Sequence, residues 1–417
     1  MRRTASLSAK IKAGLKACLK DARVTIAAFT FAVSFFGLLF AGSDAPFVTS
    51  ARSQLASLFF ADDLTPEEIK EKYWDKQLTV LIVPGHDNVD GGTSHKGVPE
   101  AEYTAKIGEY LYEYLKNDPN VKPILVRNRN GYLKEFADYF SREEAAIAQF
   151  IDRSHSYFTQ LSSSKAVVAS PPPIQHIRAN SRTVKILYGI NKWANERGVD
   201  VVLHIHLNDY PRKSWEMKYD GFSMYIPDAS FPNHAGSRGI AEALRGVFGQ
   251  YWATSNMHFE KEVILEDSAL IAVGSYGSLR AASVLMEYGY IYEPKFQTDI
   301  MLKETAFRTY QGLLSYAGDA GKMTDEFAWL APYEWTKPLS YGVLKNNDVA
   351  AFQSALVALG FYPPSGSSLR DCPVSGNFKN CTREALRGFQ EQYGISEGGQ
   401  FGNETRRKLN EVFAASR

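Results

Sequence analysis

Short apolar runs alternate with amphipathic stretches through the middle of the chain. Residues 78–83 (LTVLIV) form a continuous apolar run that ends at a Pro-Gly pair, which is typical of a buried strand. Residues 101–115 follow with apolar side chains at helical spacing. The same alternation continues along the chain. Further strand-like runs occur at residues 123–126, 199–207, 221–226 and 282–286, and a further helix-like segment occurs at residues 240–248. Strands that alternate with helices predict an α/β fold.

A long segment, residues 130–190, separates the second and third predicted strands. Its first part, residues 133–161, has a helical pattern, and its middle carries a serine triplet and a proline triplet. A segment of this length inside a compact domain is either an insertion with its own role or partly disordered. The sequence leaves both alternatives open, and the insertion is our candidate for gating access to a site.

The first 43 residues have an uneven charge distribution. Residues 1–23 carry seven Lys and Arg against one acid, and residues 24–43 carry no charge. An apolar helix of this length spans ~30 Å, the thickness of a membrane's hydrocarbon core. We therefore expect a basic cytoplasmic leader and a transmembrane anchor, with the remainder in the periplasm or another extracytoplasmic space of the cell envelope. A cleaved signal peptide and secretion are the alternative, because Ala41-Gly42-Ser43 resembles a cleavage site.

Residues 44–77 are predicted to form a stalk, within which Thr65-Pro66-Glu67-Glu68 has the pattern of a helix start.

The overall charge and composition exclude some classes of protein. Lys and Arg total 47 and Asp and Glu total 46, so the net charge of +1 argues against a nucleic-acid partner. Apolar residues make up 45%, which excludes wholesale disorder, and three cysteines are too few for a disulfide scaffold.

Residues 340–417 have a different character. An amphipathic helix is predicted over residues 348–359 and ends at a glycine. A four-residue pattern then occurs twice at identical internal spacing, with the second copy 23 residues after the first: Gly376, Phe378, Thr382 and Leu386, then Gly399, Phe401, Thr405 and Leu409. In each copy the glycine permits a turn and the threonine caps a helix. The repeat predicts a small helical domain.

Residues able to perform chemistry lie at the ends of the predicted strands. His86 follows the first strand, Glu100 begins the next helix, and Glu287 ends the fifth strand. Two further histidines, His204 and His206, alternate on the third strand and face the same side, so spacing does not choose between them. Two imidazoles, one carboxylate and an open position make a hydrolytic zinc site, beside which a second carboxylate acts as general acid and base.

Each of these residues also has a structural interpretation. A histidine at a strand end is more often packed than a ligand, and Glu100 is most simply a first-turn helix acid. Glu287 is harder to dismiss, because a carboxylate that closes an apolar strand is costly to bury. His95 is expected to be a solvated loop residue. The other histidines are interpreted as structural: His155, His176, His234 and His258. Three arginines either meet substrate carboxylates or lie on the surface: Arg127, Arg129 and Arg178.

Four motifs in this order resemble a known family: Val83-Pro84-Gly85-His86, Gly97-Val-Pro-Glu100, Ile205-His206-Leu-Asn208 and Val284-Leu-Met-Glu287-Tyr-Gly289. Over residues 78–320 they resemble the zinc-dependent N-acetylmuramoyl-L-alanine amidases of the amidase-3 family. Ala194-Asn195 and Asp200 also match the family's pattern. The resemblance implies an open mixed sheet flanked by helices. It further implies that His86, Glu100 and His206 bind Zn²⁺, that Glu287 is the catalytic acid and base, and that His204 lies behind the ligands.

The sequence departs from this family pattern at several positions. Val83 stands where Asp is common, Asp87-Asn88 replaces a glycine pair, and Thr104 stands where Asn is common. The insertion at 130–190 is also longer than the family pattern. No departure removes a zinc ligand or the catalytic acid, so the differences concern substrate preference and access.

The C-terminal residues 347–413 resemble the peptidoglycan-binding type 1 domain, which implies three helices. The residues that carry this resemblance include Phe352-Gln353, Gly376-Asn-Phe378, Phe389-Gln390 and Gly399-Gln-Phe401. Cys372 and Cys381 flank one turn of this domain and form either a disulfide, as an exported domain permits, or two free thiols.

Together the two resemblances imply a zinc hydrolase that cleaves the amide between N-acetylmuramic acid and L-alanine and is held on peptidoglycan by its C-terminal domain. The expected partners are therefore peptidoglycan, a membrane through residues 24–43, and a possible protein activator. Two other functions compete with this one. The first is a non-catalytic peptidoglycan-binding scaffold, and the second is a zinc peptidase that cuts another bond of the same polymer.

Overall fold

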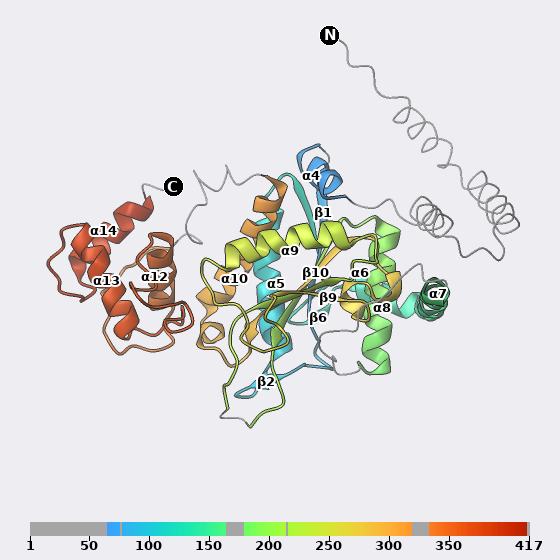
Figure 1. Ribbon diagram of the computed structural model, residues 1–417, viewed down its shortest axis with the longest axis horizontal. Coiled ribbons are helices and arrows are strands. Elements are labelled where there is room, and N and C mark those ends of the chain that lie inside the picture. The colour runs from blue at the N-terminus through green and yellow to red at the C-terminus, as the bar shows by residue number, and fades with distance from the viewer. Residues whose placement is uncertain (1–64, 76, 164–178, 214–215, 319–332, 415–417) are drawn as a thin grey trace, which may run out of the picture. The chain divides into compact units, whose positions relative to one another are not determined.

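The computed structural model describes residues 65–75, 77–163, 179–213, 216–318 and 333–414 (Figure 1). The basic leader, the predicted membrane span at 24–43 and the first part of the predicted stalk lie outside these ranges. Within them, no helix combines the length and the apolar character that crossing a membrane requires.

A six-stranded sheet forms the centre of the larger domain, with strand order β4-β1-β7-β10-β8-β9. Strands β4, β1, β7 and β10 run parallel, β8 is antiparallel to β10, and β9 is parallel to β8. The predicted mixed α/β sheet is therefore confirmed. The strands are β1 (Leu78–Pro84), β4 (Val121–Leu125), β7 (Val201–Asn208), β8 (Ser223–Pro227), β9 (Ile264–Asp267) and β10 (Ala282–Tyr290).

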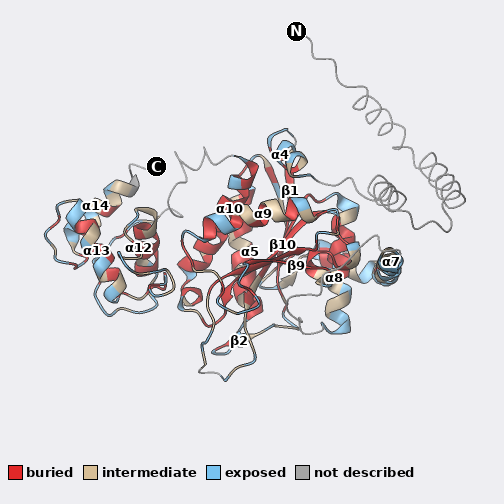
Figure 2. Ribbon diagram, viewed as in Figure 1, coloured by how far each residue is buried: buried red, intermediate tan, exposed pale blue. Residues whose placement is uncertain are grey.

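Helices cover both faces of this sheet, which explains why its strands are apolar on both sides. Alternate residues of β7 enter opposite cores: Leu203 and Ile205 pack on one side and Val202 on the other. Figure 2 shows the strands as a buried layer between partly exposed helices. The first face carries α5 (Glu100–Lys116), α9 (His234–Phe248) and α10 (Asp299–Ala317), and the second carries α6 (Lys134–Arg142), α7 (Glu144–Ser163) and α8 (Ser181–Arg197).

The structure differs from the sequence predictions in several elements. The single helix expected over 133–161 is two helices, α6 and α7, which meet at Glu143. Strand β10 continues four residues beyond the predicted end at 286. Neither β9 nor the helices α8 and α10 were predicted. The remaining short elements are α4 (Pro66–Asp75), β2 (Ser94–His95), β3 (Val98–Pro99), β5 (Arg127–Asn128), β6 (Gly131–Tyr132) and three 3₁₀ turns at Ile271–Val273, Ser275–Gly277 and Pro294–Gln297.

Helix α4 corrects the predicted stalk. Its start is the expected capping box, in which Thr65 and Glu68 exchange hydrogen bonds of 3.2 Å. However, Ile69 and Tyr73 are buried in the main core, and the Tyr73 hydroxyl donates to Asp118 at 3.0 Å. Residues 66–75 therefore belong to the folded domain, because a stalk would leave these side chains in water.

Three helices form the C-terminal domain, as predicted: α12 (Asn347–Ala358), α13 (Asn380–Gln392) and α14 (Asn403–Ala414). The repeated pattern is also a repeated hydrogen-bond motif. Gln353 donates to the Thr382 hydroxyl and Gln390 donates to the Thr405 hydroxyl, each at 2.8 Å. The carbonyl of each glutamine also accepts the backbone N–H of the repeat's glycine. Of the two alternatives for Cys372 and Cys381, the structure contains the disulfide.

Candidate active site

The three predicted ligands meet at the carboxyl edge of the sheet, although Glu100 and His206 are 106 residues apart in the sequence. His86 follows β1, His206 lies near the end of the adjacent strand β7, and Glu100 is the first residue of α5. Glu100 Oε2 lies 3.2 Å from His86 Nε2, and its Oε1 lies 3.1 Å from His206 Nδ1. One ligand atom from each residue lies within 4.8 Å of the others. Two nitrogens and one oxygen at this spacing fit a divalent zinc ion.

The backbone around His86 is shaped to admit these side chains. His86 itself has φ of 61°, in the left-handed region that non-glycine residues rarely adopt. A Cβ on Gly85 would lie 2.3 Å from Cε1 of His206, so only glycine leaves space for the ligand ring. A strained residue beside an obligatory close approach is typical of a functional site.

Arg127 and Thr104 support this turn from behind. Arg127 was predicted to meet substrate or lie on the surface, but it is 1% exposed and donates to the carbonyls of Pro84, Gly85 and Ala101. The Thr104 hydroxyl also donates to the Gly85 carbonyl, at 2.8 Å. The buried cation therefore fixes the backbone that presents His86. Thr104, one of the residues that depart from the family pattern, holds that same backbone.

Burial and mutual contact control the charges of the three ligands. Burial opposes ionisation of Glu100, but hydrogen bonds with His206 and His86 outweigh it and lower its pKa to about 2. Burial lowers the pKa of His206, whereas the contact with Glu100 leaves the pKa of His86 raised despite burial. The site therefore presents a permanent carboxylate between two imidazoles.

Glu287 lies on β10 directly beside the ligand strand. Its Cα pairs with that of His206 on β7, and on the other side with that of Ser223 on β8. Its Oε2 is buried and has no hydrogen-bond partner among the described residues. Burial and the nearby carboxylates of Glu100 and Glu260 raise its pKa well above the ordinary value. A carboxyl group in these surroundings holds its proton to a higher pH than an ordinary glutamate does, which suits it to proton transfer.

Glu260 is part of this site and was missed from the sequence. It is fully buried in a loop, where Asn208 and Tyr225 donate to Oε1 at 2.7 and 3.0 Å. Ser255 and Tyr290 donate to Oε2 at 2.5 and 3.2 Å. Four donors from different segments fill the carboxylate's acceptor sites and link β7, β8 and β10 near Glu287. No motif surrounds Glu260, so only its three-dimensional neighbourhood identifies it.

The other candidate residues are placed as follows. His204 is buried behind His206, and burial lowers its pKa to about 3, so it is neutral. His95 was expected in solvent but is 6% exposed, with its ring 6.5 Å from that of Tyr292. His155 contacts the hydroxyl of Tyr188, and His234 pairs with Glu266. Arg129 forms an exposed pair with Glu109; His176 and Arg178 lie outside the described residues.

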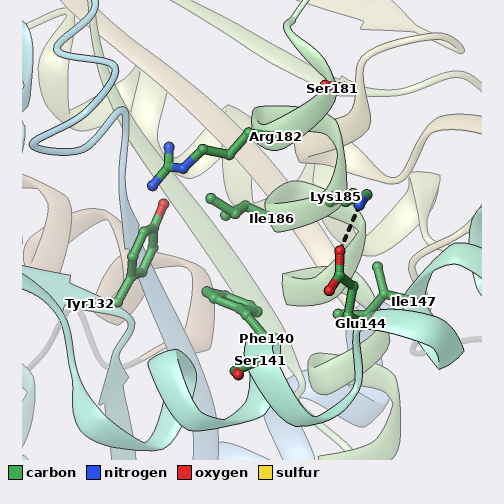
Figure 3. Close-up of a pocket in the computed structure, with 9 residues that line it drawn as sticks. All are labelled: Tyr132, Phe140, Ser141, Glu144, Ile147, Ser181, Arg182, Lys185 and Ile186. Atoms are coloured by element: carbon green, nitrogen blue, oxygen red, sulfur yellow. Dashed lines mark hydrogen bonds and ion pairs between the residues drawn. The ribbon is translucent and has the colours of Figure 1, made fainter.

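A cavity of about 480 Å³, lined by none of the cluster's residues, lies among α6, α7 and α8 (Figure 3). The two features are joined at the N-terminal end of α8. Arg182, which lines the cavity, contacts Asp87 at 2.8 Å, and Asp87 directly follows the ligand His86. The side chains of Asn180 and Thr183 both donate to Asp90 at 3.1 Å. The insertion is therefore bonded to the loop that carries His86 by one ion pair and two hydrogen bonds.

Comparison with known proteins bears first on the C-terminal domain. Residues 345–409 match the family model of a putative peptidoglycan binding domain. The C-terminal domain is of the peptidoglycan-binding kind. The duplicated Gln–Thr–Gly motif and most of the three-helix fold described above lie within this match, and the resemblance stated from the sequence is confirmed there. No curated protein matches the chain.

Solved structures of N-acetylmuramoyl-L-alanine amidases are similar to this chain over somewhat more than half of its length, at low sequence identity. The enzyme from Clostridium difficile 630 is 18% identical, with 58% of this chain and 98% of that chain covered and a TM-score of 0.37. The enzyme from Mycobacterium smegmatis is 14% identical, with 58% and 97% covered and a TM-score of 0.39. That of Nostoc punctiforme is 17% identical, with 58% and 97% covered and a TM-score of 0.36.

Proposed function

We propose that this protein is a zinc-dependent peptidoglycan hydrolase that cleaves the amide between N-acetylmuramic acid and L-alanine. The observation that carries the proposal is the meeting of His86, Glu100 and His206 at one edge of the sheet, with a high-pKa carboxyl group, Glu287, on the adjoining strand. The sequence motifs of the amidase-3 family fall on these four residues, and the C-terminal domain supplies a match to peptidoglycan binding.

In the proposed mechanism His86, Glu100 and His206 hold the zinc, which supplies Lewis acidity for the scissile carbonyl. Glu100 also orients both imidazoles, because each of its oxygens contacts one ring. Glu287 takes the proton of the attacking water and passes it to the departing nitrogen. Its burial and its carboxylate neighbours favour the protonated form, which the second transfer requires.

The C-terminal domain keeps the catalytic site close to its polymer in this proposal. Binding of the domain to the wall raises the effective concentration of scissile bonds without any new contact at the active site. A membrane anchor at residues 24–43, or secretion after cleavage there, completes the proposal by placing both domains in the cell envelope.

The test uses the full-length protein and purified sacculi, with and without a zinc chelator and with zinc added back. We expect soluble stem peptides that begin with L-alanine, no new reducing sugar ends, loss of release with chelator, and recovery with zinc. Mass spectrometry identifies the bond cut. Peptide fragments that lack L-alanine at their start would establish a zinc peptidase instead. Tight binding without any product would establish a binding protein on an amidase fold.

A further inference from the structure

A short segment of the C-terminal domain exposes two large apolar side chains. Among the described residues six large hydrophobic side chains are exposed, and two of them lie three positions apart in this segment: Tyr341 is 54% exposed and Leu344 is 53% exposed. Because leaving such side chains in water is unfavourable, a pair of them on a folded surface indicates a contact with a ligand. Residues 341–346 are called the exposed ridge below.

The backbone of the exposed ridge is fixed by the first copy of the repeated pattern. Gly342 donates to the Phe378 carbonyl and Phe378 donates to the Val343 carbonyl, each at 2.8 Å. Asn346 donates to the Gly376 carbonyl at 3.0 Å. The ridge is therefore held in place before any ligand arrives, which lowers the entropic cost of binding.

The two copies of the repeat differ in the aromatic residue that contacts them. Arg383 and Arg406 occupy equivalent positions, 23 residues apart. Arg406 of the second copy donates to the carbonyl of Trp335, which is 1% exposed. Arg383 of the first copy lies instead over the ring of Tyr341, with its guanidinium carbon 4.7 Å from the ring centroid. The second copy therefore contacts a buried tryptophan, whereas the first presents its arginine beside an exposed ring.

Polar groups beside this ring supply a cation and hydrogen-bonding atoms. The Tyr341 hydroxyl donates to Asn380 Oδ1 at 2.9 Å, and Arg383 Nη2 donates to the same oxygen at 3.1 Å. Within the described part of the chain, Arg383 Nε has no hydrogen-bond partner and no carboxylate pairs with the guanidinium. An aromatic ring, an amide and an unpaired guanidinium together fit an acidic sugar, whose ring packs on the aromatic face while its carboxylate pairs with the cation.

The proposed amidase reaction creates such an acidic sugar. Hydrolysis adds the hydroxyl of water to the lactyl carbonyl and hydrogen to the departing nitrogen of L-alanine. The lactyl group of N-acetylmuramic acid is a neutral amide before the reaction and a carboxylate after it. A strand that still carries its stem peptides offers no charge at this place on the sugar.

We propose that the exposed ridge, together with Asn380 and Arg383, binds glycan strands whose muramic acid residues carry free lactyl carboxylates. The sugar ring packs on Tyr341, its acetamido methyl group contacts Leu344, and its carboxylate pairs with Arg383. This inference rests on the proposed function, because the amidase reaction produces that carboxylate. The C-terminal domain therefore favours strands that have lost their stem peptides over intact ones.

The test measures binding of two synthetic tetrasaccharides to full-length Glu287→Gln, in which hydrolysis is blocked. Both alternate N-acetylglucosamine with N-acetylmuramic acid, and they differ only in the lactyl groups, which are free carboxylates in one and neutral methylamides in the other. We expect calorimetry to show about tenfold tighter binding of the acidic tetrasaccharide, because the neutral one lacks the charge-assisted hydrogen bonds.

Substitutions in the same full-length background assign the two contributions. Arg383→Met should weaken binding of the acidic tetrasaccharide alone and so remove the preference. Tyr341→Ala should weaken binding of both about threefold to tenfold, because both pack on the ring. Tyr341→Phe keeps the ring and should change either affinity by no more than about twofold.

A matched control comes from the same domain. Arg407 on α14 is exposed and pairs with Glu411. Arg407→Met removes the same charge away from the ridge and should leave both affinities unchanged, and thermal melts check that each variant is folded. Equal affinity for the two tetrasaccharides, a preference that survives Arg383→Met, or no binding of either would overturn the assignment.

The outcomes separate this inference from the proposed function, because both tetrasaccharides are made without the protein. If wild-type protein releases stem peptides from sacculi but the two tetrasaccharides bind equally, the ridge assignment is wrong and the amidase proposal stands. If Arg383→Met removes a clear preference but the wild-type protein releases no peptide, the proposed function is wrong and the ridge stands as a site for acidic glycan.

Discussion

Two half-buried glutamates, one in each domain, have opposite surroundings. Glu397 in the C-terminal domain accepts hydrogen bonds from the backbone N–H groups of Gly402, Glu404 and Thr405 and from the Thr405 hydroxyl. Burial opposes its ionisation, but these donors outweigh burial and lower its pKa. Glu287 in the larger domain has a buried oxygen with no partner among the described residues, and its pKa is raised.

The difference indicates what each carboxylate is for. Glu397 accepts hydrogen bonds from backbone N–H groups at the start of α14 and so stabilises the fold, as an N-terminal capping acid does. Glu287 receives no such compensation and costs stability where it stands. A group that the fold leaves uncompensated remains available to exchange protons with a substrate, whereas a saturated one does not.

Among substitutions of the two glutamates, Glu287→Gln is expected to have the largest effect on activity. The substitution removes the proton acceptor, so hydrolysis should fall by about 10²–10⁴-fold. Bound zinc, measured by metal analysis, should persist, because the three ligands are intact. Thermal stability should stay equal or rise, since a costly buried carboxyl group is gone. Undiminished peptide release from sacculi by this variant would refute the assigned role.

Glu397→Ala should have the opposite signature. Four donors at the start of α14 lose their acceptor, so the C-terminal domain should lose about 1–3 kcal/mol of stability. Binding to sacculi should weaken, while cleavage of small soluble muropeptides should be retained. Glu384→Ala, at an exposed position on α13, is the control and should change neither. If soluble cleavage falls with Glu397→Ala, the two domains do not work independently.

The duplicated motif allows a finer test within the C-terminal domain. Gln353→Ala and Gln390→Ala each remove one donor and one acceptor from equivalent positions. We therefore expect similar losses of stability, about 1–2 kcal/mol each, measured by denaturant unfolding. A loss confined to one of the two variants would mean that the sequence repeat is not an energetic repeat.

The pH dependence of metal-free stability should show the smallest effect. The lowered pKa of Glu397 contributes stability above the unfolded value of 4.5 that is lost as the pH falls below it. The raised pKa of Glu287 acts in reverse, since the folded state retains a proton that the unfolded state has lost, and stability falls as the pH rises above 4.5. Comparing thermal melts of wild type, Glu287→Gln and Glu397→Ala across pH 3–7 should show these slopes disappear one at a time.

Much of the sheet could be predicted from local signals, whereas the grouping of His86, Glu100 and His206 was predicted from motifs that resemble the amidase-3 family, since spacing did not choose between His204 and His206. The apolar runs located five of the six strands, and strand ends in a parallel sheet meet at one edge. Strand β10 was ended too early at 286 because Tyr288-Gly289-Tyr290 gives no clear apolar pattern, although all three residues are buried. The stalk was extended too far because α4 has only two buried residues among polar ones.

The missed parts depend on contacts between segments far apart in the sequence. The donors to Glu260 come from residues up to 52 positions away, and no spacing rule connects them. Arg127 was assigned to substrate or surface because arginine usually lies there. Hydrogen bonds to backbone carbonyls offset the cost of burying this cation, and these contacts cannot be identified from the sequence.

The close approach at Gly85 ties its evolution to that of the ligand ring. Because the ring of His206 occupies the space that any side chain at position 85 would need, the two positions cannot vary independently. A lineage that keeps the histidine must keep the glycine, and a lineage that loses the histidine is freed from that constraint. Among descendants of such a protein, a larger residue at position 85 would therefore mark those in which the His206 ring no longer occupies this place.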